Sequence, residues 1–156
     1  MNDLHQTQMI DVGAKATTQR QAVARGQISM LAATATLVQG AAVPKGNALE
    51  TARVAAIMAA KNTPQIIPLC HPLLISGVTC EFDCDTENGV ITATVTVKCS
   101  GQTGVEMEAL TAVAAALLTI YDMTKGIDET LEIRDIVLLS KTGGKSGDFR
   151  RAEVTP

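Results

Sequence analysis

Apolar and polar residues alternate most regularly in two stretches, residues 78–84 and residues 91–99, which the sequence TENG separates. Successive side chains of a strand point to opposite faces of a sheet, so period-two alternation indicates half-buried strands. The pattern predicts a β-hairpin over residues 77–100. It also makes Cys80, Cys84 and Cys99 small buried hydrophobic residues of that hairpin.

Three other segments have helical patterns. Residues 31–39 suit a short helix that Gly40 ends, and residues 48–62 suit an amphipathic helix that Pro64 is expected to stop. A longer helix is predicted over residues 104–125. Thr103 and Glu106 would form its capping box, and Gly126 would end it. Its centre, ALTAVAAALLTIY, is apolar almost all round, which predicts cover by a second copy of the chain. The high helix propensity of alanine is the alternative explanation.

Strands are also expected over residues 22–30 and 131–139, and residues 66–74 form a proline-containing extended connector. Strand, two helices, hairpin, helix and strand in this order favour an α+β fold. The helices would cover one face of an antiparallel sheet, and a ferredoxin-like arrangement is the nearest common architecture. The length of 156 residues fits one domain over residues 1–156, with residues 1–10 and 150–156 flexible.

Composition narrows the classes of function. The net charge of −3 and the 2% of aromatic residues argue against a nucleic-acid partner. The polar N-terminus lacks the apolar region of a signal peptide, and no stretch approaches the roughly 20 apolar residues of a membrane span. We therefore expect a cytoplasmic protein with reduced thiols and no membrane association.

The long helix ends in the sequence LLTIYDMTKGID, where Asp122 lies at the end that the helix dipole disfavours for a carboxylate. Lys125 is three residues later and shares its face. A surface ion pair would explain the two residues and would contribute less than about 1 kcal/mol. At a covered interface they would instead be a proton-transfer pair. Glu108 is about 21 Å away along the helix axis, so an antiparallel partner chain is needed to bring it to Asp122.

Several lysines and one histidine have no obvious structural purpose. KTGGKSGD, residues 141–148, lacks the P-loop spacing, but its lysines and glycine amides suit an anion. With Lys45 and Lys61 they suggest a polyanionic small molecule, and solvated surface lysines are the alternative. Zinc bound by Cys70 and His71 is disfavoured, because neighbouring side chains of an extended chain point opposite ways. A core histidine or a polar contact in a pocket are the other interpretations of His71.

The motifs IPLCHPL, KCSGQTGVEMEALTA, LTIYDMTKGID and LLSKTGGKSGDF together resemble the molybdenum cofactor biosynthesis protein C (MoaC) family. The resemblance runs from about Met9 to Phe149. It implies a ferredoxin-like fold and a homohexamer built as a trimer of dimers, with the site at the dimer interface. It also implies a lyase, cyclic pyranopterin monophosphate synthase. This activity converts 3′,8-cyclo-7,8-dihydroguanosine 5′-triphosphate to cyclic pyranopterin monophosphate and diphosphate, an early step of molybdenum cofactor biosynthesis.

The resemblance also implies roles for individual residues. Asp122 and Lys125 would be catalytic, and we expect Lys125, poised by burial and by Asp122, to be the main general acid and base. The implied substrate-binding residues are Arg20, Lys45, Lys61, Leu69, Cys70, His71, Glu106, Met107, Glu108, Lys141 and Lys145. No metal ligand and no required cofactor are implied, and Mg²⁺ is a candidate companion of the triphosphate.

Three other functions are weighed against this enzyme. The first is a nucleotide-binding sensor domain without catalysis, which would need the cations but no proton-transfer pair. The second is a metalloprotein that uses Cys70, His71 and one further thiol. The third is a purely structural oligomer, which explains the alanine-rich helix but not the lysines.

Overall fold

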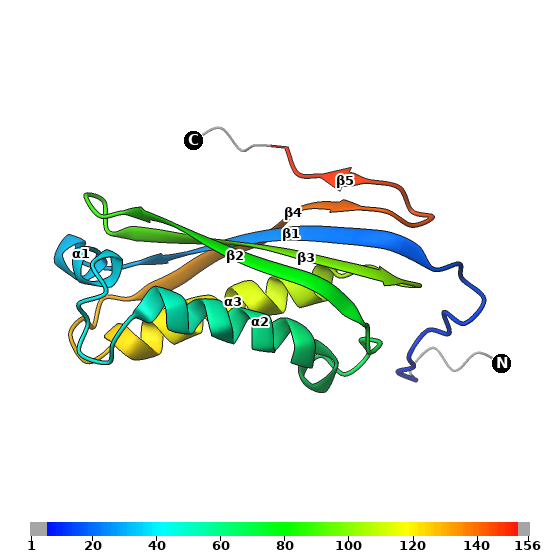
Figure 1. The fold of residues 1–156 in the computed structure, drawn as a ribbon, viewed down its shortest axis with the longest axis horizontal. Coiled ribbons are helices and arrows are strands. Elements are labelled where there is room, and N and C mark those ends of the chain that lie inside the picture. Colours follow the sequence, from blue (N-terminus) through cyan, green and yellow to red (C-terminus); the bar gives the residue numbers. More distant parts are fainter. Residues whose placement is uncertain (1–5, 153–156) are drawn as a thin grey trace.

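The computed structural model describes residues 6–152 and confirms the α+β architecture (Figure 1). The elements are β1 Thr18–Ser29, α1 Ala32–Gln39, α2 Ala48–Ile66, β2 Ile75–Asp85, β3 Val90–Gly101, α3 Glu106–Thr124, β4 Glu132–Thr142 and β5 Phe149–Arg150. The strands form one antiparallel sheet in the order β2-β3-β1-β4-β5. The first four strands have the ferredoxin-like order, as predicted, and β5 extends the sheet beyond β4.

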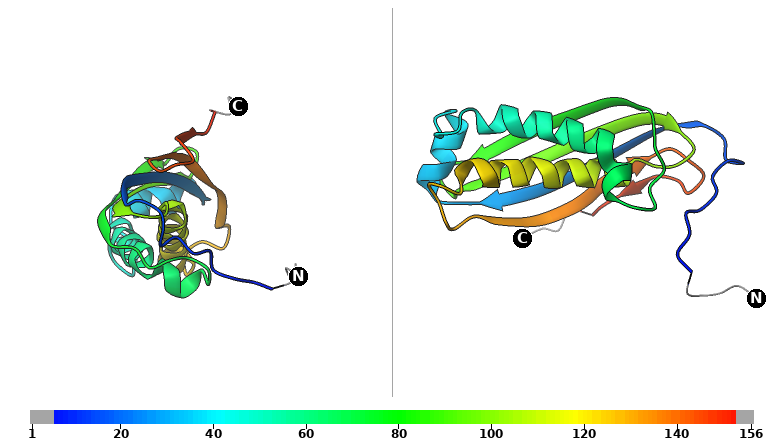
Figure 2. Two further views of the ribbon diagram at one scale, coloured as in Figure 1. Left: turned by 90° about the vertical axis from the view of Figure 1, so that its right-hand side faces the viewer. Right: turned by 90° about the horizontal axis from the view of Figure 1, so that it is seen from below.

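The helices α2 and α3 lie side by side and antiparallel on one face of the sheet (Figure 2). Helix α3 packs against β1, β3 and β4, whereas α2 packs against β2 and α1 lies at one end of the molecule. Alanines fill much of the buried surface of α2 and α3: Ala52, Ala56, Ala60, Ala109, Ala112 and Ala116. Such short side chains let helices and sheet approach closely.

Gly26 shows how closely α3 approaches β1. A Cβ atom at this position would lie 2.7 Å from Val113 Cγ1 and 2.8 Å from Leu117 Cδ1. Both distances are too short for carbon atoms in van der Waals contact. The absence of a side chain at Gly26 therefore allows the middle of α3 to rest on the central strand.

The predicted hairpin is confirmed, with β2 and β3 joined by a turn over residues 86–89. Cys80 and Cys99 are buried and Cys84 is partly buried, and all three are free thiols. Gly89 has a positive φ of 66° and its carbonyl accepts a hydrogen bond from Met30 N, so the turn is tied to the end of β1. The turn conformation favours glycine.

Several element boundaries differ from the predictions, and β4, for example, extends to Thr142 instead of ending at residue 139. Strand β1 begins at Thr18 and not at residue 22, because its polar first residues pair with β3 through backbone hydrogen bonds that the apolar pattern does not reveal. Pro64 does not stop α2, which continues to Ile66. A proline this close to the helix end removes a single backbone hydrogen bond, and Thr63 O still accepts one from Ile67 N.

The expected caps of α3 are wrong at both ends. Val105 is the N-cap and makes no side-chain hydrogen bond, so Thr103 and Glu106 form no capping box. Glu106 instead pairs with Lys141, which is the stronger partner because it is charged. At the other end the C-cap is Lys125 in a right-handed conformation, and Gly126 does not adopt a positive φ.

Two expectations about the chain as a whole also change. Length and composition alone would allow α3 to cross a membrane, contrary to the expectation that no stretch is long enough. The helix instead packs beneath the sheet, which accounts for its buried side chains, whereas Leu118 on the opposite face is 60% exposed in the single chain. Of the ends expected to be flexible, residues 1–5 and 153–156 lie outside the described residues. Arg150 belongs to β5 and pairs with Ser140.

Candidate active site

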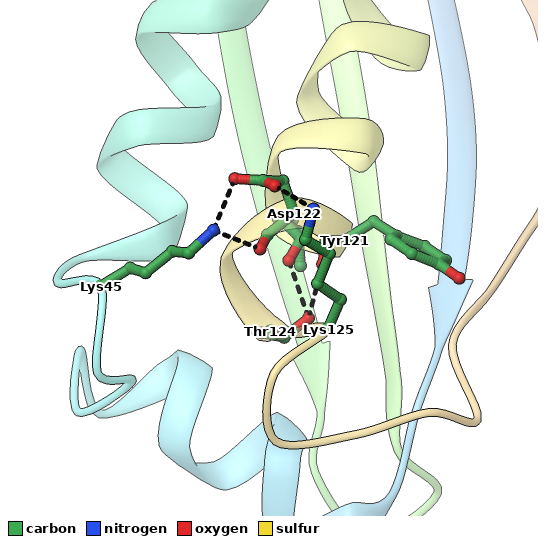
Figure 3. A network of polar contacts seen from close by, with 6 residues as sticks. Lys45, Tyr121, Asp122, Thr124 and Lys125 are labelled. Atoms are coloured by element: carbon green, nitrogen blue, oxygen red, sulfur yellow. Dashed lines mark hydrogen bonds and ion pairs between the residues drawn. The ribbon is translucent and has the colours of Figure 1, made fainter.

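The last turn of α3 carries a carboxylate between two lysines (Figure 3). Lys125 Nζ lies 2.8 Å from Asp122 Oδ1, and Lys45 Nζ lies 2.9 Å from Asp122 Oδ2. Lys45 Nζ also donates a hydrogen bond to the Asp122 carbonyl oxygen, at 2.9 Å. Lys45 belongs to the loop between α1 and α2, where Gly46 has a φ of 109°. Two segments far apart in the sequence therefore meet at Asp122.

The electrostatics of this cluster favour its fully charged form. Hydrogen bonds first from Lys125 and then from Lys45 lower the pKa of Asp122 to about 2. The hydrogen bond to Asp122 raises the pKa of Lys125 above its ordinary value of 10.5. Lys125 is therefore an ammonium ion at neutral pH, which can donate a proton.

The expected burial of Lys125 is not provided by the single chain. The side chains of Asp122 and Lys125 are 55% and 58% exposed. The reason is the face of α3 on which they lie, because Met123 and Thr124 occupy the inward face of the same turn. Residues 6–152 of this chain therefore leave the pair uncovered.

The segment after Lys125 is fixed by Asp128, which is 3% exposed and which the sequence analysis missed. Its carboxylate accepts hydrogen bonds from Leu31 N at 2.8 Å, Thr130 N at 2.8 Å and Thr130 Oγ1 at 2.7 Å. Burial alone would raise the pKa of Asp128, but these hydrogen bonds outweigh it and hold the pKa at about 2. The ionised carboxylate thus ties the α3–β4 loop to the start of α1.

At the opposite end of α3, a cavity of about 640 Å³ gathers basic side chains. Arg20, Lys141 and Lys145 line it, together with Glu106 and the glycine-rich loop after β4. Arg20 donates hydrogen bonds to the carbonyls of Gly101 and Gln102, at 3.2 and 3.1 Å. Lys141 Nζ lies 2.9 Å from Glu106 Oε1. Arg20 keeps an uncompensated positive charge, because its partners are neutral carbonyls.

A second cavity, of about 330 Å³, lies beside the first and shares Glu106, Thr103 and Gly104 with it. It brings together six of the predicted substrate-binding residues: Leu69, Cys70, His71, Glu106, Met107 and Glu108. The proline-containing connector before β2 supplies the first three, and the first turn of α3 supplies the others. The sequence motifs thus meet in space although they are separated along the chain.

The predicted site residues therefore lie in two groups, one at each end of α3, and Lys61 belongs to neither group. Nine lie around the two cavities at the N-terminal end of α3, whereas Lys45, Asp122 and Lys125 lie at its C-terminal end. Glu108 and Asp122 are fourteen residues apart on one continuous helix, which is about 21 Å. Lys61 is exposed on α2 and lines neither cavity.

Cys70 and His71 have separate local environments in this chain. Partial burial raises the pKa of the Cys70 thiol, and the nearby Glu108 carboxylate adds to the effect, so the thiol stays protonated. His71 Nε2 donates a hydrogen bond to the Ile10 carbonyl at 2.8 Å. Among residues 6–152 there is no group of three or more His, Cys, Asp or Glu side chains placed to hold a metal ion.

The lining of the larger cavity includes polar residues that sequence reasoning missed, among them Lys15, Thr18 and Gln102. The first two lie in a polar stretch without periodicity, which gave no structural prediction. The signal that could have found them was the resemblance itself, which begins at Met9 and so includes this stretch.

Comparison with known proteins identifies the family. The model of the MoaC family matches residues 9–144. The chain belongs to the MoaC family. Two proteins named "Cyclic pyranopterin monophosphate synthase" are similar to this MoaC chain over most of their lengths. The protein from Chloroflexus aggregans is 52% identical over 93% of the chain and 88% of its own length. The protein from Pelotomaculum thermopropionicum is 50% identical over 97% of the chain and 89% of its own length.

A third relative of the same name, from Herpetosiphon aurantiacus, is 47% identical over the whole MoaC chain and 94% of its own length. The matched range contains all the predicted site residues except Lys145, which follows the matched residues directly. The predicted family is therefore confirmed, as is the prediction that the chain is an enzyme. The roles of the individual residues stay predictions.

Glu108 gives this MoaC chain a testable pH dependence. The side chain is 2% exposed, and burial, with the neighbouring Glu106, raises its pKa above the ordinary 4.5. The folded chain then holds the proton more tightly than the unfolded chain, so the free energy of unfolding falls as pH rises from 4.5 through the raised pKa. We expect Glu108→Gln to remove this fall and to raise the melting temperature at pH 8 above that of the parent protein.

The measurement is thermal unfolding of both proteins at pH 4 and pH 8. Glu129→Gln, a change of an exposed glutamate in the α3–β4 loop, is the matched control and should leave the pH dependence unchanged. A Glu108→Gln protein that is less stable than the parent at pH 8 would show that Glu108 is stabilised in its ionised form.

Proposed function

We propose that this chain is a cyclic pyranopterin monophosphate synthase of molybdenum cofactor biosynthesis. It would convert 3′,8-cyclo-7,8-dihydroguanosine 5′-triphosphate to cyclic pyranopterin monophosphate and diphosphate. The named activity of the relatives supports the reaction. The observation that carries the proposal is the adjacency of the two cavities, one basic and one acidic, which share Glu106. A nucleotide-derived triphosphate has a phosphate chain that suits the basic cavity and a ring system that suits the acidic one.

The basic cavity suits the phosphate chain. Arg20 and Lys145 would make charge-assisted hydrogen bonds to phosphate oxygens, and Lys141 would divide its charge between phosphate and Glu106. The smaller cavity suits the guanine-derived ring system. Buried Glu108 would hydrogen-bond the N–H edge of the ring. Cys70 and Met107 would give the ring an apolar and polarisable wall.

Lys125 would supply the acid of the reaction. Opening the guanine ring and closing the pyranopterin require several proton transfers at carbon–nitrogen bonds. The ammonium of Lys125, held by Asp122, would protonate a leaving nitrogen, and the resulting amine would take up a proton in a later step. Asp122 remains ionised throughout because its pKa is about 2. It would orient the amine and stabilise its charged form.

The last step would form the cyclic phosphate. A hydroxyl oxygen of the rearranged ribose carbons would form a bond to the α-phosphorus, while the bond from this phosphorus to the bridging oxygen breaks and diphosphate leaves. The hydroxyl proton passes to a base or to water. Lysines would stabilise the charge on the leaving group. The overall change is a rearrangement with elimination, so its balance needs no oxidant or reductant.

One site would need two chains. Lys125 and Glu108 lie at opposite ends of α3, and both Asp122 and Lys125 are open to a covering surface. A second chain that packs antiparallel would place its Lys125 beside the cavities of the first. We propose a homohexamer arranged as a trimer of dimers, in the cytoplasm. Mg²⁺ would enter only with the triphosphate.

The experiment is incubation of the purified chain with the cyclised triphosphate, followed by detection of diphosphate and of the pterin by its fluorescence after oxidation. We expect the two products in equal amounts. A sensor domain would bind the triphosphate without releasing diphosphate. Binding without product would therefore replace the proposed enzyme by the sensor.

A further inference from the structure

The segment that precedes β1, residues 10–16, runs past both cavities, and we name it the N-terminal strap. Three side-chain contacts hold it. His71 Nε2 donates to the Ile10 carbonyl at 2.8 Å, while Gln102 Nε2 donates to the carbonyls of Gly13 and Lys15, at 3.2 and 3.0 Å. His71 lines the smaller cavity and Gln102 lines the larger one. The strap is thus fastened to the walls of the candidate active site itself.

The fastening is weak compared with the rest of the fold. The strap contains no helix or strand, and all its residues except Val12 are exposed. Beyond the three contacts it has a local turn, in which Lys15 N donates to the Val12 carbonyl at 2.9 Å. A neutral hydrogen bond contributes about 0.5–1.5 kcal/mol, so the strap can open without disturbing the sheet. A ligand that contacts the closed strap would stabilise the closed form.

The strap also adds a positively charged side chain, Lys15, to the larger cavity. Lys15 lines this cavity together with Arg20 and Lys145, whereas Lys141 is already paired with Glu106. In the described residues neither Lys15 nor Lys145 has a carboxylate within ion-pair distance. The cavity therefore has more positive than negative groups and favours a ligand with several negative charges.

An independent observation points to a missing ligand atom at the same place. Thr18 Oγ1 is the one buried side-chain oxygen or nitrogen without a hydrogen-bond partner in the part of the chain that the structure describes. Thr18 is the first residue of β1, two residues after the end of the strap, and it lines the larger cavity. A buried hydroxyl without a partner costs about 1–3 kcal/mol, which a phosphate oxygen would relieve.

We propose that the N-terminal strap closes over the phosphate chain of the substrate, with Lys15 and Thr18 as further binding residues. Gln102 is a positioning residue, which acts by holding the strap backbone through the carbonyls of Gly13 and Lys15. His71 fastens the other end of the strap. The identity of the anion rests on the proposed function, but the closure itself does not.

The closure can be tested by trypsin, which cleaves after Lys15. The full chain is digested with and without inorganic tripolyphosphate, and the fragment that begins at Ala16 is measured by mass spectrometry. We expect tripolyphosphate to slow this cleavage at least about tenfold and Gln102→Ala to weaken the protection. Gln27→Ala is the control, because it removes an amide hydrogen bond to Thr92 within the sheet. Cleavage at an unchanged rate with tripolyphosphate would overturn the closure, as would complete resistance without it.

The binding residues are tested by kinetics with the cyclised triphosphate. We expect Lys15→Ala to raise KM about tenfold with kcat changed less than about twofold, since a charged hydrogen bond contributes about 1.5–3 kcal/mol. Thr18→Val should raise KM by a smaller factor. Lys98→Ala, at an exposed lysine on β3, should leave KM unchanged. An unchanged KM in Lys15→Ala would overturn its role. Normal trypsin protection without any diphosphate release would overturn the proposed function and leave the strap intact.

Discussion

Replacement of Lys125 by alanine is expected to lower kcat for release of diphosphate from the cyclised triphosphate by about 10²–10⁴-fold, the range for loss of a general acid. Lys125 is an ammonium ion at neutral pH, and the hydrogen bond to Asp122 raises its pKa further. The alanine variant has no proton to donate. The fold should survive, because the side chain is 58% exposed and contacts Asp122 at the surface. The measurement is steady-state diphosphate release by the wild-type and variant proteins, with thermal unfolding as a check of the fold.

Lys125→Arg separates proton donation from simple charge. Arginine can keep the ion pair with Asp122, but the guanidinium group holds its proton too tightly to transfer it near neutral pH. We expect this variant to bind tripolyphosphate normally and to lose about as much kcat as Lys125→Ala. If arginine restores most of the activity, the role of Lys125 is electrostatic. If Lys125→Ala retains kcat within about threefold of wild type, Lys125 has no part in the chemistry.

The second large effect is expected from a mixture of two inactive variants. Glu108→Ala disables the cavity end of α3, and Lys125→Ala disables the other end. In a shared site each chain supplies one half, so random assembly of equal amounts leaves about a quarter of the sites with both halves intact. We therefore expect activity to recover to about a quarter of the wild-type value.

The two chains should be co-expressed with different affinity tags, and mixed assemblies should be purified through both tags before the assay. A mixture of Glu108→Ala with Glu106→Ala is the matched control, because both changes fall at the same end of α3 and no site regains a complete set of residues. Recovery in the first mixture alone supports sharing. The absence of recovery in both would place the complete site within one chain.

The sequence was sufficient for the hairpin and for the order of the first four strands, and nine of the predicted site residues line the two cavities, while their roles stay predictions. The alternation over residues 78–99 predicted the hairpin, because side-chain burial on one face sets that pattern directly. The order of elements predicted the ferredoxin-like topology, and the motifs predicted which residues surround the cavities. These features depend on local periodicity or on residue identity, and both can be read along the chain.

Features that depend on contacts between distant segments were not predicted. Glu106 had the spacing of a capping residue, but Lys141, thirty-five residues later, takes its carboxylate. The contact of Lys45 with Asp122 spans seventy-seven residues, and the contact of Asp128 with Leu31 spans ninety-seven. No periodicity marks such pairs. The strap was overlooked for the same reason, since Gln102 binds its backbone and not its side chains.

Gly26 affects the positions of residues that it does not contact, because α3 rests on it. A methyl group there would press on Val113 and Leu117, near the midpoint of α3. Because α3 is one continuous helix, a displacement at its midpoint would move both of its ends. Such a shift would draw Glu106 and Glu108 away from one set of loops and Asp122 and Lys125 away from another. The absence of a side chain at Gly26 therefore affects the position of both groups of candidate site residues at once. If the proposed assembly shares its sites between chains, the two ends of one α3 belong to two different sites.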